Sequence, residues 1–397
     1  MIKQNSIFGE GFKGSTLIKG VRLLDGSFSD ILIENGKIKG IGGIEDGAEK
    51  VIPAEGLLAL PGLIDLHAHI RGIETLKTAT EAAIAGGFTC ICMMPNTIPP
   101  IDSVQRLRGL KQKIKDKALV SVLPIPSIAI GMGQSELADI EGFAKEGVFA
   151  ISDDGHTIHN LSLLRETCLE AKRLGLLVIL HAEDDGEEPD AVEKRIELAY
   201  LTGAKLHIAH ISTMEGVKLV AGAKKSRINV TTEATPHHFT LTENDIRLND
   251  TNFKVNPKIK SYKDREAIRE GLADGTIDII ATDHAPHTKK AKEGGWDVAA
   301  PGIVGLETCL GLVWTELVKT GILSERSAIE KLTTNPARMI GITENKENLL
   351  LIDPNKEWLV NPLNFKSQGR NTPFSGRRLK GKVVLLQQNK SLTLSKK

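Results

Sequence analysis

The sequence predicts a (β/α)8 TIM barrel, an α/β fold, joined to a small β-sandwich that both chain ends build together. Two observations carry this prediction. Between residue 62 and about residue 340, strand-like apolar runs alternate with helix-like amphipathic segments. Outside this stretch, residues 15–53 and 349–386 show short strand-like runs, with glycine turns in the first of them. We therefore expect residues 1–57 and 349–397 in the sandwich and residues 58–348 in the barrel.

Eight apolar runs in the central stretch are the expected barrel strands. In chain order they cover residues 62–67, 88–94, 119–124, 148–153, 176–181, 206–211, 228–233 and 277–282. The segments between them include residues 74–87, 161–175, 214–225 and 263–275. Several of these segments end in glycine after the last apolar position, which is a normal helix stop. This count rests on the apolar pattern alone, and a barrel domain with seven or nine strands is the alternative.

Composition excludes several classes of protein. The chain has 397 residues and a net charge of +1, which gives no electrostatic reason to expect nucleic acid or a membrane surface as partner. The first residues, MIKQNSIFGEGF, lack the apolar core of a signal peptide, and no apolar run approaches the ~20 residues of a spanning helix. Four cysteines are too few for a disulfide framework, and we interpret the pair Cys90 and Cys92 as reduced, packed thiols. A cytoplasmic protein is expected.

Metal-binding residue types recur at the carboxyl ends of the expected strands. Strand one ends in "LHAHIR", where alternation would point His67, His69 and Arg71 the same way. The corresponding residues of strands four, five, six and eight are Asp153-Asp154, His181, His210 and Asp283. In a barrel these positions converge on the face that carries the active site. Four histidines and two carboxylates suffice for two divalent metals that share a bridging ligand.

Each of these residues also has an ordinary structural interpretation. A lone H-x-H pair is common, "SDDG" is more often a turn, and Asp283 alone could cap a helix. His237 and His238, in "ATPHH" after strand seven, compete for a ligand role. We interpret them as residues that lie behind the metal ligands or support the fold, because strand six already supplies His210 as a ligand. The recurrence of ligand types at one kind of position is what favours a metal site.

The motifs resemble those of the amidohydrolase superfamily and, within it, the bacterial type I dihydroorotase family. The matching stretches are "PGLIDLHAHIR", "MMPNTIPP", "SDDG", "HAED", "HIAHIST", "TPHH", "ATDHAPHT", "GIVGLET" and "GRNTPFSG". They occur in that family's order and span most of the chain. Related hydantoinases usually bridge their metals with a carboxylated lysine, whereas this chain has Asp153-Asp154. After Arg71 the family usually has Glu-Pro-Gly, whereas Gly72-Ile73-Glu74 follows here and the connection is shorter.

The resemblance implies a barrel of the metal-dependent amidohydrolase kind and a role for each matched residue. The implied metal ligands are His67, His69, Asp154, His181, His210 and Asp283. Asp154 is expected to bridge two Zn²⁺ ions, with Asp153 as the alternative, and Asp283 doubles as the general acid/base. The implied substrate contacts are Arg71, Asn96 and His287 to a carboxylate, and Asn256, Pro301 and Gly302 to a ring.

The activity implied by the resemblance is the reversible cyclisation of N-carbamoyl-L-aspartate to L-dihydroorotate in pyrimidine synthesis. Two alternatives stay open. One is another cyclic amidohydrolase, such as an allantoinase or hydantoinase. Arg71 and Asn96 argue against it, because they favour a substrate ring that bears a carboxylate. The other is a non-catalytic scaffold partner, which would not need to keep all six ligands. A homodimer and an association with aspartate carbamoyltransferase are the partners to expect beside the small-molecule substrate.

Overall fold

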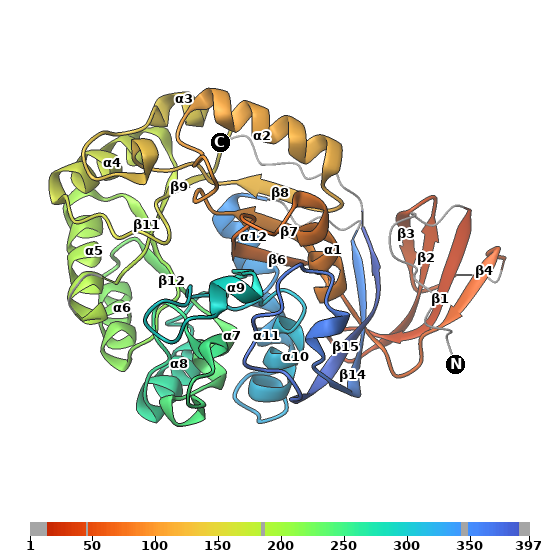
Figure 1. Cartoon of the computed structure of the whole chain (residues 1–397). Helices are drawn as coiled ribbons and strands as arrows, with labels where there is room; N and C mark the ends of the chain where they lie inside the picture. Colours follow the sequence, from red (N-terminus) through yellow and green to blue (C-terminus); the bar gives the residue numbers. More distant parts are fainter. Residues whose placement is uncertain (1–13, 45–46, 184–186, 343–347, 389–397) are drawn as a thin grey trace.

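The computed structural model describes residues 14–44, 47–183, 187–342 and 348–388. Its larger part is a barrel of eight parallel strands with helices on the outside (Figure 1). In chain order the barrel strands are β6 (Leu63–Ala68), β7 (Phe88–Met93), β8 (Ser121–Pro124), β9 (Ala150–Ser152), β10 (Leu177–Leu180), β11 (Lys205–Ile208), β12 (Val230–Ala234) and β13 (Ile279–Ile280). Each overlaps one of the strands expected from the apolar pattern, so the count of eight is confirmed.

Backbone contacts close the barrel at the two places where the regular strand ladders stop. The ladder β6–β7–β8 meets the ladder β9–β13 where Ser152 N donates to Pro126 O at 3.0 Å. At the other seam Ala68 pairs with His284, and His69 N donates to His284 O at 2.8 Å. The predicted barrel is thereby confirmed.

The side chain of Asp65 reinforces the second seam. Its Oδ1 accepts from Thr282 N at 2.8 Å, and its Oδ2 accepts from Thr282 Oγ1 at 2.6 Å. Burial raises the pKa of Asp65 to about 7, although the bonds from Thr282 act against this shift. Since Thr282 directly precedes Asp283, Asp65 holds the backbone that presents this predicted site residue.

Helices surround the barrel, and four of them match the predicted amphipathic segments. The α-helices are α1 (Leu76–Gly86), α2 (Val104–Lys117), α3 (Ile140–Lys145), α4 (Leu161–Leu174), α5 (Glu188–Thr202), α6 (Met214–Lys225), α7 (Pro236–Thr240), α8 (Tyr262–Asp274), α9 (Lys289–Lys292), α10 (Cys309–Val313), α11 (Glu325–Glu330) and α12 (Thr334–Ile340). Short 3-10 turns are η1 (Ile130–Met132), η2 (Glu243–Asp245), η3 (Thr251–Phe253) and η5 (Pro362–Asn364), and η4 (Trp314–Val318) is a π-helical turn. Left-handed Gly87, Gly175 and Gly275 end α1, α4 and α8, as the glycine pattern predicted.

Strands from both chain ends form a second, seven-stranded sheet beside the barrel. Its strands are β1 (Ser15–Arg22), β2 (Phe28–Glu34), β3 (Lys37–Ile41), β4 (Lys50–Pro53), β5 (Leu58–Leu60), β14 (Leu349–Leu359) and β15 (Arg378–Gln387). The order is β15-β14-β5-β1-β2-β3, and β4 also pairs with β1. In Figure 1 the blue strands β14 and β15 lie between the barrel and the red strands β1 to β3.

Apolar side chains from both arms of this branched sheet share one buried cluster, as expected of a small sandwich. Its members include Ile18, Ile31 and Ile52 from the N-terminal strands and Leu351 and Leu385 from the C-terminal ones. The burial of these β-branched and leucine side chains is what draws the two ends of the chain together. The exact division into residues 1–57 plus 349–397 and residues 58–348 stays a prediction.

The cysteines are buried and free, which confirms their interpretation as reduced, packed thiols. Cys90 and Cys92 lie in one apolar cluster with Ile179 of β10 and Ile340 of α12. Within the described ranges, none of the helices combines the length and apolar character needed to span a membrane. The residues on which the signal-peptide prediction rests, 1–12, lie outside the described part of the chain.

Candidate metal centre

His67 and His69 converge at the end of β6, on two carboxylates from other strands. His67 Nε2 lies 3.0 Å from Asp154 Oδ2, and His69 Nε2 lies 3.3 Å from the same oxygen. His69 Nε2 also lies 3.1 Å from Asp283 Oδ1. The pairing of β6 with β7 also shifts register between Asp65 and Ala68, so the strand is irregular where it presents His67.

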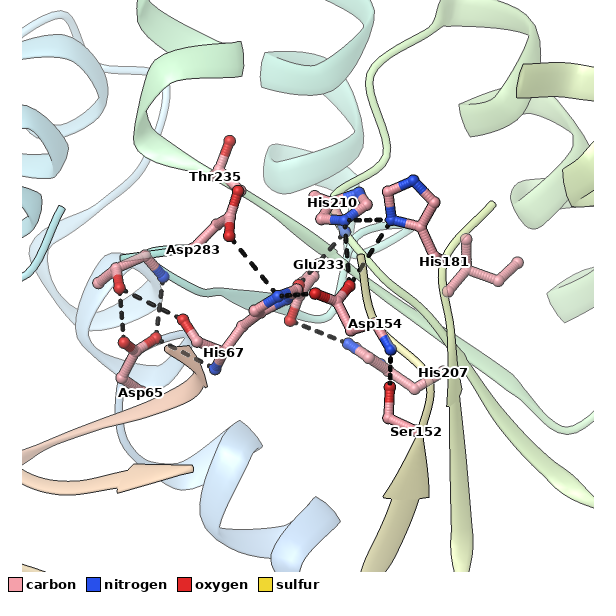
Figure 2. A network of polar contacts seen from close by, with 12 residues as sticks. Asp65, His67, Ser152, Asp154, His181, His207, His210, Glu233, Thr235 and Asp283 are labelled. Carbon is pink, nitrogen blue, oxygen red and sulfur yellow. Dashed lines mark hydrogen bonds and ion pairs between the residues drawn. The ribbon is translucent and has the colours of Figure 1, made fainter. Parts of the chain in front are cut away.

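Asp154 lies between two pairs of histidines, and Figure 2 shows it between His67 on one side and His181 and His210 on the other. Its Oδ2 faces His67 and His69, whereas its Oδ1 lies 3.4 Å from His210 Nε2 and 3.6 Å from His181 Nδ1. The nitrogens of the second pair are 3.0 Å apart. A carboxylate with one oxygen toward each pair has the geometry of a bridging ligand.

Asp153, the alternative from the sequence, points elsewhere. Its Oδ1 accepts from Ile128 N at 2.7 Å and from Ala129 N at 3.4 Å, on the segment after β8. Burial raises the pKa of Asp153 to about 7, against the effect of these two bonds. The structure therefore brings Asp154, and not Asp153, into the histidine cluster.

The cluster contains two overlapping groups that could each hold a metal ion. One is formed by His67, Asp154 and His210, and the other by His67, His69 and Asp283. His67 Nε2 and Asp154 Oδ1 are buried and have no hydrogen-bond partner among the described residues. Unsatisfied polar atoms in a dry interior are costly unless an ion binds them. Buried imidazole nitrogens and carboxylate oxygens fit divalent ions such as zinc.

Hydrogen bonds behind the cluster orient its imidazoles. His67 Nδ1 lies 2.6 Å from Glu233 Oε1, and His69 Nδ1 lies 2.9 Å from Asn96 Oδ1. Both oxygens accept, so each ring donates from Nδ1 and keeps the Nε2 lone pair for an ion. Glu233 Oε2 in turn lies 3.1 Å from His207 Nε2. Sequence reasoning missed Glu233 and His207; an acidic residue at the end of the expected strand 228–233, and a second histidine in "HIAHIST", were the available signals.

The charges within the cluster favour ionised carboxylates and the protonated forms of His67, His69 and His181 when no ion is bound. Burial alone would raise the pKa of Asp154, but the charge of His67 and contacts with other histidines hold it well below its ordinary value. Burial likewise opposes the shift at Asp283, whose pKa is lowered by His69 and His67. Burial would lower the pKa of His181, yet contacts with carboxylates raise it to about 9. Metal binding must displace such protons and will therefore depend on pH.

Arg71 lies near the cluster without a direct ion pair to it in the described structure. Its Nε is buried and lacks a hydrogen-bond partner among the described residues. Burial lowers the pKa of Arg71 from its ordinary value, and the charges of Asp283 and Asp154 act in the opposite direction. Burial and the charge of Arg71 lower the pKa of His287 to about 4, so His287 is neutral at pH 7. Arg71 therefore lies close enough to His287 for its charge to disfavour protonation of that imidazole.

The loops that carry the other predicted substrate contacts meet at Asn371. Its Nδ2 donates to Gly302 O and to Ala285 O, each at 2.9 Å, and its Oδ1 accepts from His287 N at 2.9 Å. Gly302 has a φ of 139°, and a Cβ there would lie 2.7 Å from Ala285 Cβ, so only glycine fits. The role of Asn371 was missed, although its motif "GRNTPFSG" was noted.

Pro301 and Asn256 complete the set of predicted substrate contacts. Pro301 is exposed, and its O lies 2.9 Å from His287 Nε2. Asn256 is exposed, two residues after Lys254, whose O accepts from Gly302 N at 2.9 Å. Neither residue belongs to the two metal-binding groups.

His238 is held by the fold, in keeping with a structural role. Its Nδ1 lies 2.8 Å from Thr235 Oγ1, and its Nε2 lies 3.0 Å from Pro257 O. His237 is buried, and burial together with the neighbouring His238 holds its pKa well below the ordinary value. The histidine that joins Asp154 in a metal-binding group is His210.

Comparison with known proteins gives consistent results. A family model described as "Dihydro-orotase-like" matches residues 56–225. The dihydroorotase of Pelotomaculum thermopropionicum is 42% identical over 406 residues, covering 92% of this chain and 95% of the relative. The dihydroorotase of Caldanaerobacter subterraneus is 41% identical, with coverage of 89% and 90%.

Among solved structures, the L-hydantoinase (dihydropyrimidinase) of Arthrobacter aurescens superposes with a TM-score of 0.83 at 25% identity and covers 96% of both chains. The dihydropyrimidinase of Brevibacillus agri superposes with a TM-score of 0.84 at 20% identity, covering 96% of this chain and 95% of the other. At this identity the second likeness concerns the fold alone.

Proposed function

Because the chain belongs to the dihydroorotase family of metal-dependent cyclic amidohydrolases, we propose that it interconverts N-carbamoyl-L-aspartate and L-dihydroorotate. The observation that carries the proposal is the pair of His/Asp groups that share His67, with Asp154 between the histidines. A non-catalytic scaffold would have no need of so closely built a site.

We propose that two zinc ions bind this cluster. The proposed ligands are His67, His69, Asp154, His181, His210 and Asp283, with Asp154 as the bridge. Such ions, when bound, act as Lewis acids and can lower the pKa of a water molecule from ~15.7 to about 7. The contacts of Glu233 with His67 and of Asn96 with His69 keep these two rings in a fixed orientation.

Asp283 is the proposed general acid/base. In the hydrolytic direction a water oxygen bonds to the ring carbonyl carbon, and the carbon–nitrogen amide bond breaks. Asp283 takes the proton from the water and returns it to the leaving nitrogen. Its lowered pKa keeps the carboxylate ionised at neutral pH. Asp65, through Thr282, holds the backbone from which Asp283 reaches the cluster.

Arg71, Asn96 and His287 are the proposed contacts of the substrate carboxylate, and Asn256, Pro301 and Gly302 those of the ring. Arg71 can donate two parallel hydrogen bonds from its planar guanidinium, which suits a carboxylate. Asn96 Oδ1 accepts a hydrogen bond from His69 Nδ1, so Asn96 Nδ2 is the atom that can donate to a substrate oxygen. Support for the clamp comes from the electrostatic proximity of Arg71 to Asp283 and His287.

A hydantoinase-like activity is the second candidate, because the solved structures with this fold include an L-hydantoinase. Turnover of dihydroorotate and metal content, measured on the same sample, distinguish the two. We expect turnover of dihydroorotate with about two ions per chain. Turnover of hydantoin but not of dihydroorotate would favour the second candidate, and a metal-free sample with full activity would contradict both.

We further propose a cytoplasmic homodimer that can associate with an aspartate carbamoyltransferase. The four free, buried cysteines support a reducing compartment. Light scattering on the purified protein, alone and mixed with the transferase, tests the assembly. A monomer that is unaffected by the transferase would contradict it.

A further inference from the structure

A chain of buried polar side chains leads from the metal cluster into the barrel. His67 Nδ1 lies 2.6 Å from Glu233 Oε1, and Glu233 Oε2 lies 3.1 Å from His207 Nε2. His207 Nδ1 then lies 2.9 Å from Thr231 Oγ1. The first three residues are completely buried. Figure 2 shows Glu233 between His67 and His207.

This arrangement determines which nitrogen of His67 carries the proton. A carboxylate only accepts hydrogen bonds, so both imidazoles that face Glu233 donate to it. His67 therefore holds its proton on Nδ1, and its Nε2 lone pair points toward Asp154 and Asp283. His67 is the one member that the two metal-binding groups share, so its orientation affects both ions.

The series of hydrogen-bonded side chains that begins at His67 ends at Thr231, at the opposite end of the barrel from the metal cluster. Thr231 lines a cavity of about 410 Å³, together with Leu177, Leu206 and Asn229 near the starts of neighbouring strands and Met339 of α12. Thr231 Oγ1 also lies 3.3 Å from Leu206 O, farther than its 2.9 Å from His207. The hydrogen-bonded chain thus runs through the barrel interior from one end toward the other.

We propose that Glu233 and His207 are positioning residues of the metal centre. Thr231 anchors His207, His207 holds Glu233, and Glu233 fixes His67 with Nε2 toward the ions. The inference rests on the metal site of the proposed function, but not on its substrate. Outer hydrogen bonds of this kind orient metal ligands and typically change metal affinity or activity 10–100-fold when they are removed.

The experiment compares zinc binding to metal-free wild type and Glu233→Gln by competition with a chromophoric chelator, without substrate. Glutamine keeps the shape of glutamate, but its amide donates on one side, so one of the two imidazoles loses its acceptor. We expect zinc affinity to fall roughly 10–100-fold. The visible spectrum of the cobalt-loaded variant should change, because one shared ligand is no longer held in a single orientation. With dihydroorotate, kcat should fall while KM stays within about twofold, since Arg71 is untouched.

Two neighbouring threonines supply the matched control. Thr231→Val removes the anchor of His207, and we expect about fivefold weaker zinc binding from the loss of one hydrogen bond. Thr232 is buried next to Thr231 and donates to Ile208 O at 2.8 Å. It therefore takes no part in the hydrogen bonds that link Thr231 to His67. Thr232→Val should leave the zinc affinity and the cobalt spectrum unchanged.

An unchanged zinc affinity and cobalt spectrum in Glu233→Gln would overturn the proposal. Equal losses in Thr231→Val and Thr232→Val would also overturn it, because they would indicate general damage to the core. If Glu233→Gln does not fold, the threonine pair decides the question alone. A wild-type protein that turns over dihydroorotate but binds no zinc would overturn both this proposal and the metal site of the proposed function, whereas zinc binding without such turnover would contradict only the substrate.

Discussion

His210 and Asp283, two of the proposed ligands, have backbone conformations that side chains rarely adopt. Their φ angles are 31° and 46°. Such residues cost of order 1–3 kcal/mol each and persist only where their surroundings fix them. Asp65 fixes the residue before Asp283, and Glu233 Oε1 accepts from His210 N at 3.3 Å. The fold therefore holds both residues where their side chains reach the cluster.

Asp283→Asn should lose most turnover while it keeps the fold. Asparagine matches the shape of aspartate and tolerates a positive φ, but its amide cannot shuttle the proton. We expect kcat to fall by ~10²–10⁴-fold, the usual contribution of general acid–base catalysis. Asp153→Asn is the matched control, since Asp153 is buried next to Asp154, yet within the described part of the chain its side chain accepts only from Ile128 N and Ala129 N. Near-normal turnover in Asp283→Asn would assign the proton transfer to another group.

Arg71→Ala should remove the preference for a ring that bears a carboxylate. A site built to pair a charged group penalises a substrate without it, because its own polar atoms stay unpaired. We expect the ratio of kcat/KM for dihydroorotate over dihydrouracil to fall by roughly 10²-fold or more. Arg71→Lys should restore only part of it, since an ammonium group cannot form the bidentate pair. An unchanged ratio in Arg71→Ala would place the carboxylate elsewhere.

At the residue scale, the sequence predicted which residue types would meet but not how they are bonded. His67, His69, Asp154, His210 and Asp283 do converge. Whether Asp153 or Asp154 enters the cluster was left open, because both precede a turn and the pattern of residue types is the same. The contact of Asn96 with His69 depends on how far two neighbouring strands extend, which no single-sequence pattern specifies.

At the scale of elements, the segment 366–371 is held in place by residues that lie far from it in the sequence. It follows β14, in the C-terminal part of the chain, yet side chains from the barrel loops hold it. Glu74 Oε2 accepts from Ser367 Oγ at 2.6 Å and from Gln368 N at 3.1 Å. Glu74 N also donates to Arg71 O at 3.1 Å, so the short connection after Arg71 is a tight turn tied to this segment. Local patterns predict strands and helices well, but they cannot predict contacts between residues this far apart in the chain.

Glu307→Gln should stabilise the protein above pH 7 relative to wild type. Glu307 Oε1 accepts from Lys366 N and Ser367 N, and both bonds survive in glutamine. Burial raises the pKa of Glu307 from 4.5 to about 7, despite these two bonds. The folded wild type therefore binds a proton that the unfolded chain releases between these values, so its stability falls as pH rises through that window.

The glutamine variant lacks this titration, so the difference between the two proteins should grow as pH rises through the window and reach its full size above it. Since the side chain is partly exposed, we expect a gain of roughly 1–2 kcal/mol at pH 8 and little difference at pH 4.5. Urea unfolding of both proteins at the two pH values measures it. A difference that does not change with pH would show that Glu307 is ionised in the folded protein throughout.

At the scale of the whole molecule, metal removal should abolish turnover and lower stability without changing the fold. Elemental analysis is expected to find about two ions per chain. An ion present at a thousand times its dissociation constant stabilises the folded state by about 4 kcal/mol. Thermal unfolding with and without a chelator, followed by addition of zinc, checks both effects. Full turnover in a verified metal-free sample would remove the metal from the mechanism.

The barrel itself could be predicted because its eight strands and four of its helices leave local apolar patterns. The sheet shared by both chain ends could be predicted only in outline. Its register, such as Leu351 opposite Ala59, depends on pairing between residues far apart in sequence. The closing contacts at His284 and Asp65 were not predicted, because β13 is only two residues long and pairs through side chains as much as through backbone.

The small sheet also imposes an order on biosynthesis. Strand β5 leaves the ribosome early, whereas its partner β14 begins at Leu349, about 290 residues later. At roughly 5–20 residues per second, the edge of β5 waits on the order of 15–60 s. During that interval Leu58 and Leu60 flank an unpaired strand edge, a surface that recruits other nascent chains. Chaperone demand should therefore be greatest before β14 is translated, and a circular permutant in which β14 and β15 precede β1 should need less assistance.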